Sequence, residues 1–321
     1  MTKKHSSPKI SIIGCGNVGT RYAYALTIKG IAREIVMVDI DRKRLEGEVM
    51  DLSHTAPYTS PVDIIAGDYN DIEGSEMVVI TAGKNQKPGE TRTDLVHKNV
   101  DLFKKIIPKI HEYSPKSIYL VVSNPVDILS YVTFRLSGKP KNEVLGSGTT
   151  LDTARFRYLL AKYCQINARN VHAYILGEHG DSEFPVWSSA MIGGMLIKDY
   201  RKMCQFSNLG ESDEQLSYIF EKVKNSAYKI IDRKGETSYG IGLALARISQ
   251  AIINDENTIL SVSTFIEDYY GIDDLYLSLP SVINKNGIKR TLKISLDDEE
   301  VNKFRFSANK IKDIIQKINI N

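Results

Sequence analysis

Cysteine is scarce in this sequence of 321 residues, which contains only Cys15, Cys164 and Cys204. An odd number of widely spaced cysteines fits neither a disulfide framework nor a zinc motif. Reduced thiols in a cytoplasm are the interpretation that remains. Cys15 lies between two glycines, and we expect it to be a small packing residue.

Long apolar runs are missing as well. The polar N-terminal residues 1–9 are followed by a short apolar run over residues 10–13, and the rest of the chain has no long uninterrupted run. A signal peptide needs a longer apolar region, and a membrane span needs about eighteen or more apolar residues. A secreted or membrane-spanning protein is therefore disfavoured.

Neither sign of charge dominates. The chain has 42 Lys and Arg residues against 39 Asp and Glu residues, for a formal net charge of +3. The signs are mixed along the chain, so no basic stripe indicates nucleic-acid binding. Basic residues with a function must therefore act locally, at an anionic ligand.

The apolar content is sufficient for two hydrophobic cores. Hydrophobic residues make up 42% of the chain and charged residues 25%, as in ordinary globular proteins. A chain of this length exceeds the usual limit for one core. We expect two domains, residues 1–146 and 147–321, which meet through a packed boundary because no low-complexity linker separates them.

The first half alternates between Val- and Ile-rich strands and amphipathic helices. This alternation predicts a Rossmann-type, doubly wound parallel sheet, and hence an α/β fold class. The expected strands cover residues 9–13, 34–39, 62–66, 77–81 and 117–123, and the expected helices begin at residue 20 and cover 45–52 and 95–110.

The second half predicts a mixed α+β domain. Its expected helices cover residues 151–163, 211–232, about 240–254 and 297–318. Its expected strands cover residues 170–176, 259–265 and 275–283.

A glycine-rich motif follows the first strand and opens the first helix. Gly14 permits a tight turn, Gly16 allows a pyrophosphate to approach the backbone, and Gly19 lets helix and strand pack closely. Asp39 ends the second strand, where a carboxylate binds the ribose hydroxyls and repels a 2′-phosphate. The motif predicts NAD rather than NADP; glycines of an ordinary tight turn are the alternative.

Two segments carry a candidate proton donor and anion binder. Asp152 and Arg155 are three residues apart, so they share one face of a helix. His179 lies in the segment Gly-Glu-His-Gly-Asp after a strand. We predict that the His179 imidazolium donates a proton to a ketone oxygen, that Asp152 orients the ring and raises its pKa, and that Arg155 binds a carboxylate.

Two further segments complete the predicted site. Asn124 lies at the carboxyl end of a parallel strand, where such sheets bind ligands. Arg92 ends a loop that begins at Gly83, and loop closure would bring it to the substrate carbonyl, which it would polarise.

Simpler interpretations exist for each of these residues. Asp152 and Arg155 form a common helical salt-bridge pattern, and His179 and Asn124 suit turn or capping roles. Glu178, His179 and Asp181 suggest a metal site, but residues at adjacent and alternating positions converge poorly on one ion. We expect no metal.

These motifs, taken in order, resemble the lactate/malate dehydrogenase family over nearly the whole chain. The resemblance implies that His179 and Asp152 form the proton-donating pair, that Arg155 holds the substrate carboxylate and that Arg92 polarises the carbonyl. It implies substrate contacts from Gln86, Arg92, Asn124, Arg155 and Thr237. The implied NAD contacts are Gly14, Gly16, Asn17, Val18, Gly19, Asp39, Thr81, Ala82, Gly83, Ser123, Asn124 and Ile241.

Gln86 decides between the two branches of the family. In malate enzymes an arginine at this position pairs with the second carboxylate, and lactate enzymes have glutamine. A dianion opposite a neutral amide forgoes a charged hydrogen bond, at a cost of about 1.5–3 kcal/mol. Lys84 and Lys87 flank Gln86 and could compensate. We expect reduction of pyruvate to L-lactate with NADH; the alternatives are a malate or broader 2-hydroxy-acid dehydrogenase and a catalytically silent nucleotide-binding protein on the same fold.

The resemblance extends to bacterial lactate dehydrogenases that fructose 1,6-bisphosphate regulates. It implies that Arg157 and His172 bind this effector across a subunit interface of a cytoplasmic homotetramer. Arg157 lies two residues beyond Arg155, so it faces away from the active site on a helix. An ordinary surface arginine and a strand histidine are the alternative.

Overall fold

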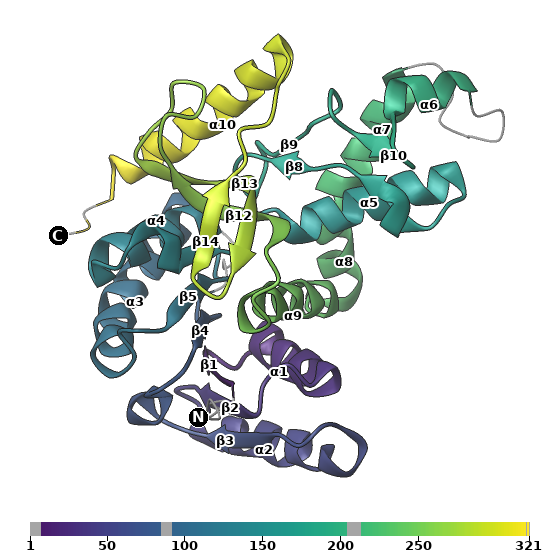
Figure 1. The fold of residues 1–321 in the computed structure, drawn as a ribbon. Coiled ribbons are helices and arrows are strands. Elements are labelled where there is room, and N and C mark those ends of the chain that lie inside the picture. Colours follow the sequence, from purple (N-terminus) through teal and green to yellow (C-terminus); the bar gives the residue numbers. More distant parts are fainter. Residues whose placement is uncertain (1–7, 85–91, 204–212, 319, 321) are drawn as a thin grey trace, which may run out of the picture.

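A nine-stranded sheet runs through the molecule in the order β14-β13-β12-β6-β5-β4-β1-β2-β3 (Figure 1). The computed structural model describes residues 8–84, 92–203, 213–318 and 320, without the side chains of residues 92 and 213. The strands of this sheet are β1 (Lys9–Ile13), β2 (Glu34–Val38), β3 (Asp63–Ala66), β4 (Met77–Ile80), β5 (Ile118–Val121), β6 (Val144–Gly146), β12 (Thr258–Ile266), β13 (Leu275–Asn284) and β14 (Gly287–Thr291).

The six strands from β3 to β6 are parallel, in the spatial order 3-2-1-4-5-6. This is the doubly wound Rossmann order, so the predicted fold class is confirmed. The helices of this half are α1 (Asn17–Lys29), α2 (Arg42–Ser53), α3 (Arg92–Tyr113) and α4 (Val126–Ser137). The structure adds α4 and β6, which the sequence did not indicate.

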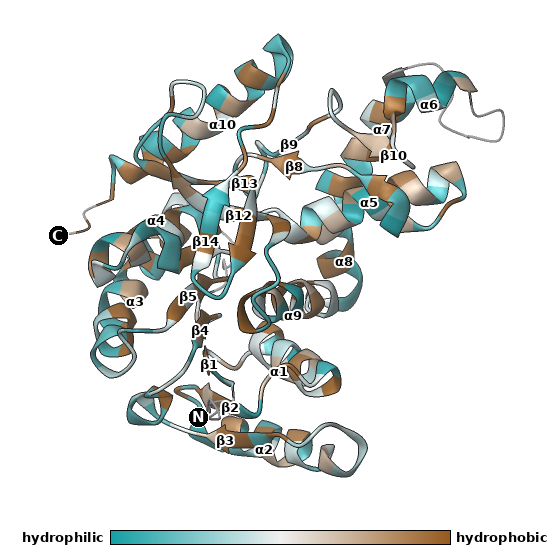
Figure 2. Ribbon diagram, viewed as in Figure 1, coloured by the Kyte–Doolittle hydropathy of each residue, from teal (hydrophilic) through white to brown (hydrophobic). Residues whose placement is uncertain are grey.

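The strands are buried on both faces because helices cover each side. On β2, Ile35 and Met37 pack with apolar residues of α1, α2 and α9 (Tyr239–Ile253), whereas Val36 and Val38 face the core formed with α3 and α4. Side chains of a strand point alternately to opposite faces, so apolar residues are needed at every position. The central strands β4 and β5 are correspondingly brown, that is hydrophobic, in Figure 2.

Strands from the second half extend this sheet instead of forming a separate one. β12 pairs antiparallel with β6 at Ser263 and Gly146, and β13 and β14 follow antiparallel. Helix α9 also packs against α1 of the first half. The two halves of the chain therefore share one continuous sheet and one of its helical layers.

The rest of the second half contributes a third core, which includes Phe156, Leu160 and Ile219 and lies between its first three helices, whereas its C-terminal helix packs on the core of the large sheet through Phe304, Ala308 and Ile311. Its helices are α5 (Thr150–Cys164), α6 (Ile197–Met203), α7 (Asp213–Lys224), α8 (Ser226–Lys234) and the C-terminal α10 (Asp298–Ile315). Its short strands are β7 (Val171–His172), β8 (Ile175–Leu176), β9 (Phe184–Pro185), β10 (Met191–Ile192) and β11 (Met195–Leu196). Single 3-10 turns cover Ala56–Tyr58, Tyr69–Ile72, Lys141–Glu143 and Ala168–Asn170.

Two predicted elements are divided in the structure. The strand expected over residues 170–176 is split because β7 pairs with β10 whereas β8 pairs with β9. The helix expected over residues 211–232 begins outside the described residues and breaks at Asn225, between α7 and α8. The Asn225 side chain donates to the Glu221 carbonyl and the Ser226 hydroxyl donates to the Lys222 carbonyl, and such bonds compete with helical continuity.

None of the helices in the described ranges combines the length and apolar character needed to cross a membrane.

Candidate active site

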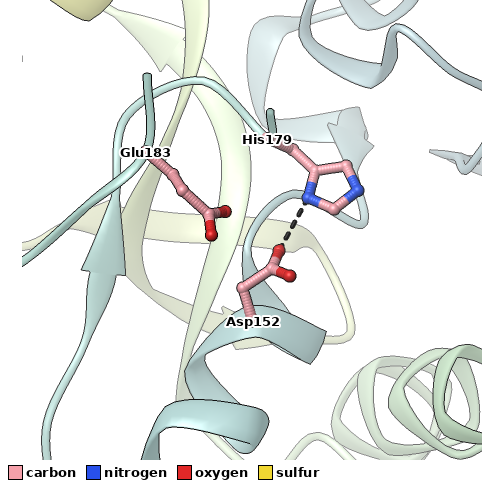
Figure 3. A group of neighbouring side chains, drawn as sticks. All are labelled: Asp152, His179 and Glu183. Carbon is pink, nitrogen blue, oxygen red and sulfur yellow. Dashed lines mark hydrogen bonds and ion pairs between the residues drawn. The ribbon is translucent and has the colours of Figure 1, made fainter. Parts of the chain in front are cut away.

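The Asp152 carboxylate joins a histidine and an arginine. Its Oδ2 lies 2.6 Å from Nδ1 of His179 (Figure 3), and its Oδ1 lies 2.8 Å from Nη1 of Arg155. Asp152 is on the first turn of α5, Arg155 is one turn later, and His179 follows β8. The Asp152 side chain is only 4% exposed, whereas that of His179 is 26% exposed. A buried carboxylate thus holds two cationic groups at the border of solvent.

The charges of this group shift each other's pKa. Burial opposes the imidazolium charge, but the charge and hydrogen bond of Asp152 outweigh it and raise the pKa of His179 to about 9. For Asp152, burial favours the neutral acid, but His179 and Arg155 outweigh it and lower the pKa below its usual value. The two groups therefore stay charged together around neutral pH. His179 Nδ1 is occupied by Asp152, so Nε2 is the nitrogen left for a substrate.

The turn that carries His179 is held by buried polar groups of distant elements. Gly177 has φ +93°, and a Cβ there would lie 2.8 Å from Oγ of Ser307 on α10. That same Oγ accepts the backbone N–H of Glu178 at 2.7 Å. The turn therefore requires a glycine at its start, and it is anchored to the C-terminal helix.

Asp127 of α4 holds the backbone of His179 itself. Its Oδ2 accepts the His179 N–H at 2.8 Å, and its Oδ1 accepts the Ser263 hydroxyl of β12 at 2.5 Å. Burial raises the pKa of Asp127 to about 7, against the effect of these two donors. The role of Asp127 was not predicted from the sequence, where the available signal was a charged residue in the otherwise apolar start of α4.

The glycine-rich turn between β1 and α1 leaves room for a phosphate. A Cβ on Gly14, at φ +94°, would lie 2.4 Å from the backbone of Ala82, and one on Gly19 would lie 2.3 Å from the Gly14 carbonyl. A Cβ on Gly16 would have no atom within 4 Å, so open space lies at this point. Helix α1 has neither a side-chain N-cap nor an acidic residue in its first turn. Its N–H groups are therefore available to a pyrophosphate, and the residues fit NAD.

Asp39 lies beside this turn at the end of β2. Its Oδ2 accepts the Cys15 N–H at 2.6 Å, and its Oδ1 accepts the Asp41 N–H at 2.9 Å. These bonds fix the carboxylate at the carboxyl end of the parallel strands. Asn17 is exposed and accepts a hydrogen bond from Arg44, and Val18 packs against the core below α1.

The ends of β4 and β5 bring the other predicted NAD contacts together. The Thr81 hydroxyl donates to the Gly14 carbonyl, and the Ser123 hydroxyl donates to the Ala82 carbonyl at 2.6 Å. Gly83 lies against Ser123, because a Cβ on Gly83 would be 3.3 Å from the Cβ of Ser123. Asn124 is exposed and precedes a cis bond to Pro125.

Asn99 of α3, which was not predicted from the sequence, connects these two strand ends. Its side chain is buried, accepts the Lys84 N–H at 2.7 Å and donates to the Asn124 carbonyl at 2.8 Å. The available sequence signal was an asparagine at helical spacing from Val96 and Phe103, on the apolar face of an amphipathic helix.

The remaining predicted residues have different positions. Gln86 lies outside the described residues, and Arg92 is the first residue of α3 but its side chain is not among those described. Thr237 precedes α9 and is half-buried, and Ile241 on α9 packs beside the α1 layer. Arg157 and His172 lie outside the Asp152 group: Arg157 donates to the Ala173 carbonyl at 2.9 Å, and His172 is exposed on β7.

Three potential metal ligands lie close together in the described residues, but they are not the three considered from the sequence, Glu178, His179 and Asp181. Asp152, His179 and Glu183 bring one potential ligand atom each within 4.8 Å of one another. Both Asp152 oxygens already accept bonds from His179 and Arg155, and the nearby guanidinium repels a cation. This arrangement favours proton transfer over metal binding.

Family models match both halves of the chain. The lactate/malate dehydrogenase NAD-binding domain matches residues 8–146, and the lactate/malate dehydrogenase α/β C-terminal domain matches residues 149–320. The chain belongs to the lactate/malate dehydrogenase family. The match to the first of these models shows an NAD-binding domain, which agrees with the open glycine turn beside Asp39.

Individual relatives within the lactate/malate dehydrogenase family are similar over nearly their full length. L-lactate dehydrogenase 1 of Clostridium acetobutylicum is 50% identical over 311 residues, 97% of this chain and 98% of the relative. L-lactate dehydrogenase of Acetivibrio thermocellus is 50% identical over 314 residues, with the same coverage. The crystal structure of the minor L-lactate dehydrogenase from Enterococcus mundtii superposes with a TM-score of 0.94 at 39% identity, covering 98% of this chain and 99% of that one.

Proposed function

We propose that the chain reduces pyruvate to L-lactate with NADH and catalyses the reverse reaction. The observation that carries the proposal is the His179–Asp152–Arg155 group, in which one buried carboxylate holds an imidazolium and a guanidinium. A monocarboxylic 2-oxo acid offers a carboxylate to Arg155 and a ketone oxygen to His179. The named relatives, all L-lactate dehydrogenases, support this choice of substrate.

The residues of the chain account for the proton and the orientation of the substrate. When bound, the nicotinamide supplies the hydride that reaches the ketone carbon. His179 Nε2 transfers its proton to the ketone oxygen, and the new O–H bond replaces the N–H bond. Asp152 keeps the proton of Nδ1 in place, so the neutral ring has a defined tautomer after the transfer. Arg155 fixes the substrate carboxylate through two N–H groups.

The preference for pyruvate over oxaloacetate rests on Gln86. A neutral amide gives a second carboxylate no charged partner, which favours the monoanion by about 1.5–3 kcal/mol. We propose Arg92 as the residue that polarises the ketone, and Thr237 and Asn124 as further substrate contacts. NAD contacts are proposed for the glycine turn, Asp39 and the ends of β4 and β5.

The assay of NADH oxidation with pyruvate and with oxaloacetate tests the proposed function. We expect turnover with pyruvate to exceed that with oxaloacetate at least tenfold in kcat/KM. The variant His179→Asn should lose turnover almost completely while binding NADH nearly as tightly as the wild type. Faster reduction of oxaloacetate than of pyruvate would favour a malate dehydrogenase. Absence of turnover with intact NADH binding would favour a catalytically silent nucleotide-binding protein.

We further propose a cytoplasmic homotetramer that fructose 1,6-bisphosphate activates through Arg157 and His172. Exposed apolar side chains on neighbouring elements, Tyr24 and Ile28 of α1 and Leu243 of α9, support subunit contacts, and the buried thiol of Cys15 fits a reducing compartment. Adding the bisphosphate to the pyruvate assay at low substrate tests activation. An unchanged rate contradicts it.

A further inference from the structure

Glu183 is a buried carboxyl next to the proton-donating pair, and the proposed mechanism does not use it. It precedes β9 and is only 7% exposed. In Figure 3 its carboxyl group points toward Asp152 and His179. One oxygen or nitrogen atom of each of the three residues lies within 4.8 Å of the others. Its backbone N–H donates to the Gly180 carbonyl at 3.2 Å. This bond closes the turn after His179 and holds the backbone of Glu183 in place.

The charges around Glu183 come from several elements. Asp152 and Arg155 face it from α5, His179 from the turn before it, and Lys224 from α7. Asp127 of α4 accepts the backbone N–H of His179, and its charge also raises the pKa of the imidazole. Burial and the negative charge of Asp152 raise the pKa of Glu183 well above its usual value. Glu183 therefore changes its charge at a higher pH than an exposed glutamate, closer to the range in which His179 titrates.

The two titrations influence each other because the groups are so close. When Glu183 is ionised, its negative charge lies beside His179 and raises the pKa of the imidazole. A negative charge at this distance stabilises the imidazolium, so His179 keeps its proton to a higher pH than Asp152 alone would allow. His179 must be protonated to reduce the ketone and neutral to oxidise the alcohol.

We propose that Glu183 holds the proton on His179 and thereby sets the pH at which the chain changes from reducing the 2-oxo acid to oxidising the 2-hydroxy acid. This inference rests on the proposed function. Glu183 is a positioning residue for the proton, because it acts through His179 and not on the substrate.

The variant Glu183→Gln tests the proposal, because it keeps the size of the side chain and removes its charge. We expect the upper limb of the pH profile of kcat/KM for pyruvate to move to lower pH by roughly 1 unit. The rising limb for lactate oxidation should move by the same amount. At acid pH, where Glu183 carries its proton, variant and wild type should agree within about twofold.

The matched control is Glu300→Gln. Glu300 is also a buried glutamate, and it accepts hydrogen bonds from the backbone and hydroxyl of Ser188, but it belongs to α10 and does not face His179. Its replacement should lower the stability of the fold and leave both limbs of the pH profile in place.

A second readout does not depend on turnover. An NMR titration of the His179 ring, assigned through His179→Asn, should show a lower midpoint in Glu183→Gln than in the wild type. If Glu183→Gln does not fold, Glu183→Met, of similar volume, takes its place. An unshifted His179 midpoint, or an equal loss of rate at every pH, overturns the role of Glu183. Failure of the wild type to reduce pyruvate would overturn the proposed function instead.

Discussion

At the scale of single residues, the site depends on one carboxylate that serves two cations. Asp152 is buried and its oxygens are divided between His179 and Arg155. The salt bridge expected as the simpler interpretation is therefore present, but it includes His179 as well. Because the pKa of His179 is raised to about 9, it lies above the usual 6.5 of an imidazole. Interaction with Asp152 thus stabilises the fold fully below about pH 6.5, and this stabilisation is lost as the pH rises through about 9.

Replacing Asp152 with asparagine should lower the His179 pKa toward 6.5. A full return to 6.5 would lower the protonated fraction of His179 at pH 8 from about nine-tenths to about three-hundredths. Because Glu183 and Asp127 also raise this pKa, pyruvate reduction should fall by up to roughly thirtyfold from this cause alone. The pH profile of kcat/KM measures the shift. The loss in free energy of unfolding should be larger at pH 6 than at pH 10, as measured with urea. A profile that keeps its wild-type upper limb would contradict the assignment of Asp152.

At the scale of elements, the His179 turn depends on a helix more than a hundred residues away. Ser307 of α10 is fully buried, accepts the Glu178 N–H at 2.7 Å and lies 3.0 Å from the Ser182 hydroxyl. The Ser182 hydroxyl in turn donates to the Glu178 carboxylate. Helix α10, with its Asp297–Glu300 capping box, therefore holds the backbone that presents the imidazole.

The variant Ser307→Ala leaves the Glu178 N–H buried without its acceptor, at a cost of about 1–3 kcal/mol in the free energy of unfolding. Because the turn loses its anchor, we expect kcat for pyruvate to fall about five- to tenfold with KM nearly unchanged. Ser11→Ala is the control, since the Ser11 hydroxyl is also fully buried and lies 2.7 Å from the Ser75 hydroxyl. Ser11 is in the middle of β1, before the glycine-rich turn. Equal kinetics in both variants would show that α10 does not position His179.

Local patterns and long-range contacts were unequally visible in the sequence. The glycine turn, Asp39 and the Asp152–Arg155 pair depend on neighbours a few residues away, or on a fixed βαβ geometry, so spacing predicted them. The bonds from Asp127 to Ser263 and from Glu178 to Ser307 span 136 and 129 residues. No periodicity encodes such pairings, because each residue alone looks like an ordinary helix or strand residue. The break at Asn225 was missed for a related reason, because helical apolar spacing continues through it.

At the scale of the whole molecule, the two halves are joined where β12 meets β6. Gly146 has no room for a side chain: a Cβ there would lie 2.5 Å from Oγ of Ser130 and 2.8 Å from Cβ of Ser263. The end of β6 can therefore pair with β12 only because residue 146 is a glycine. Since this pairing and the α1–α9 contact join the halves, we expect the chain to unfold as one cooperative unit.

The variant Gly146→Ala tests this junction. The added methyl group forces the strands or α4 apart, so we expect a loss of about 1–3 kcal/mol in the free energy of unfolding. Gly47→Ala is the control, because a Cβ at Gly47 would meet no atom within 4 Å and alanine favours the helix α2 by about 1 kcal/mol. Fluorescence of Trp187, the single tryptophan, reports on the second half, and circular dichroism reports on the whole chain. In the wild type the fluorescence and the circular dichroism should change at the same urea concentration, because a sheet shared by the two halves cannot lose one half and keep the other intact. Separate transitions would show that the β6–β12 pairing does not couple the two halves.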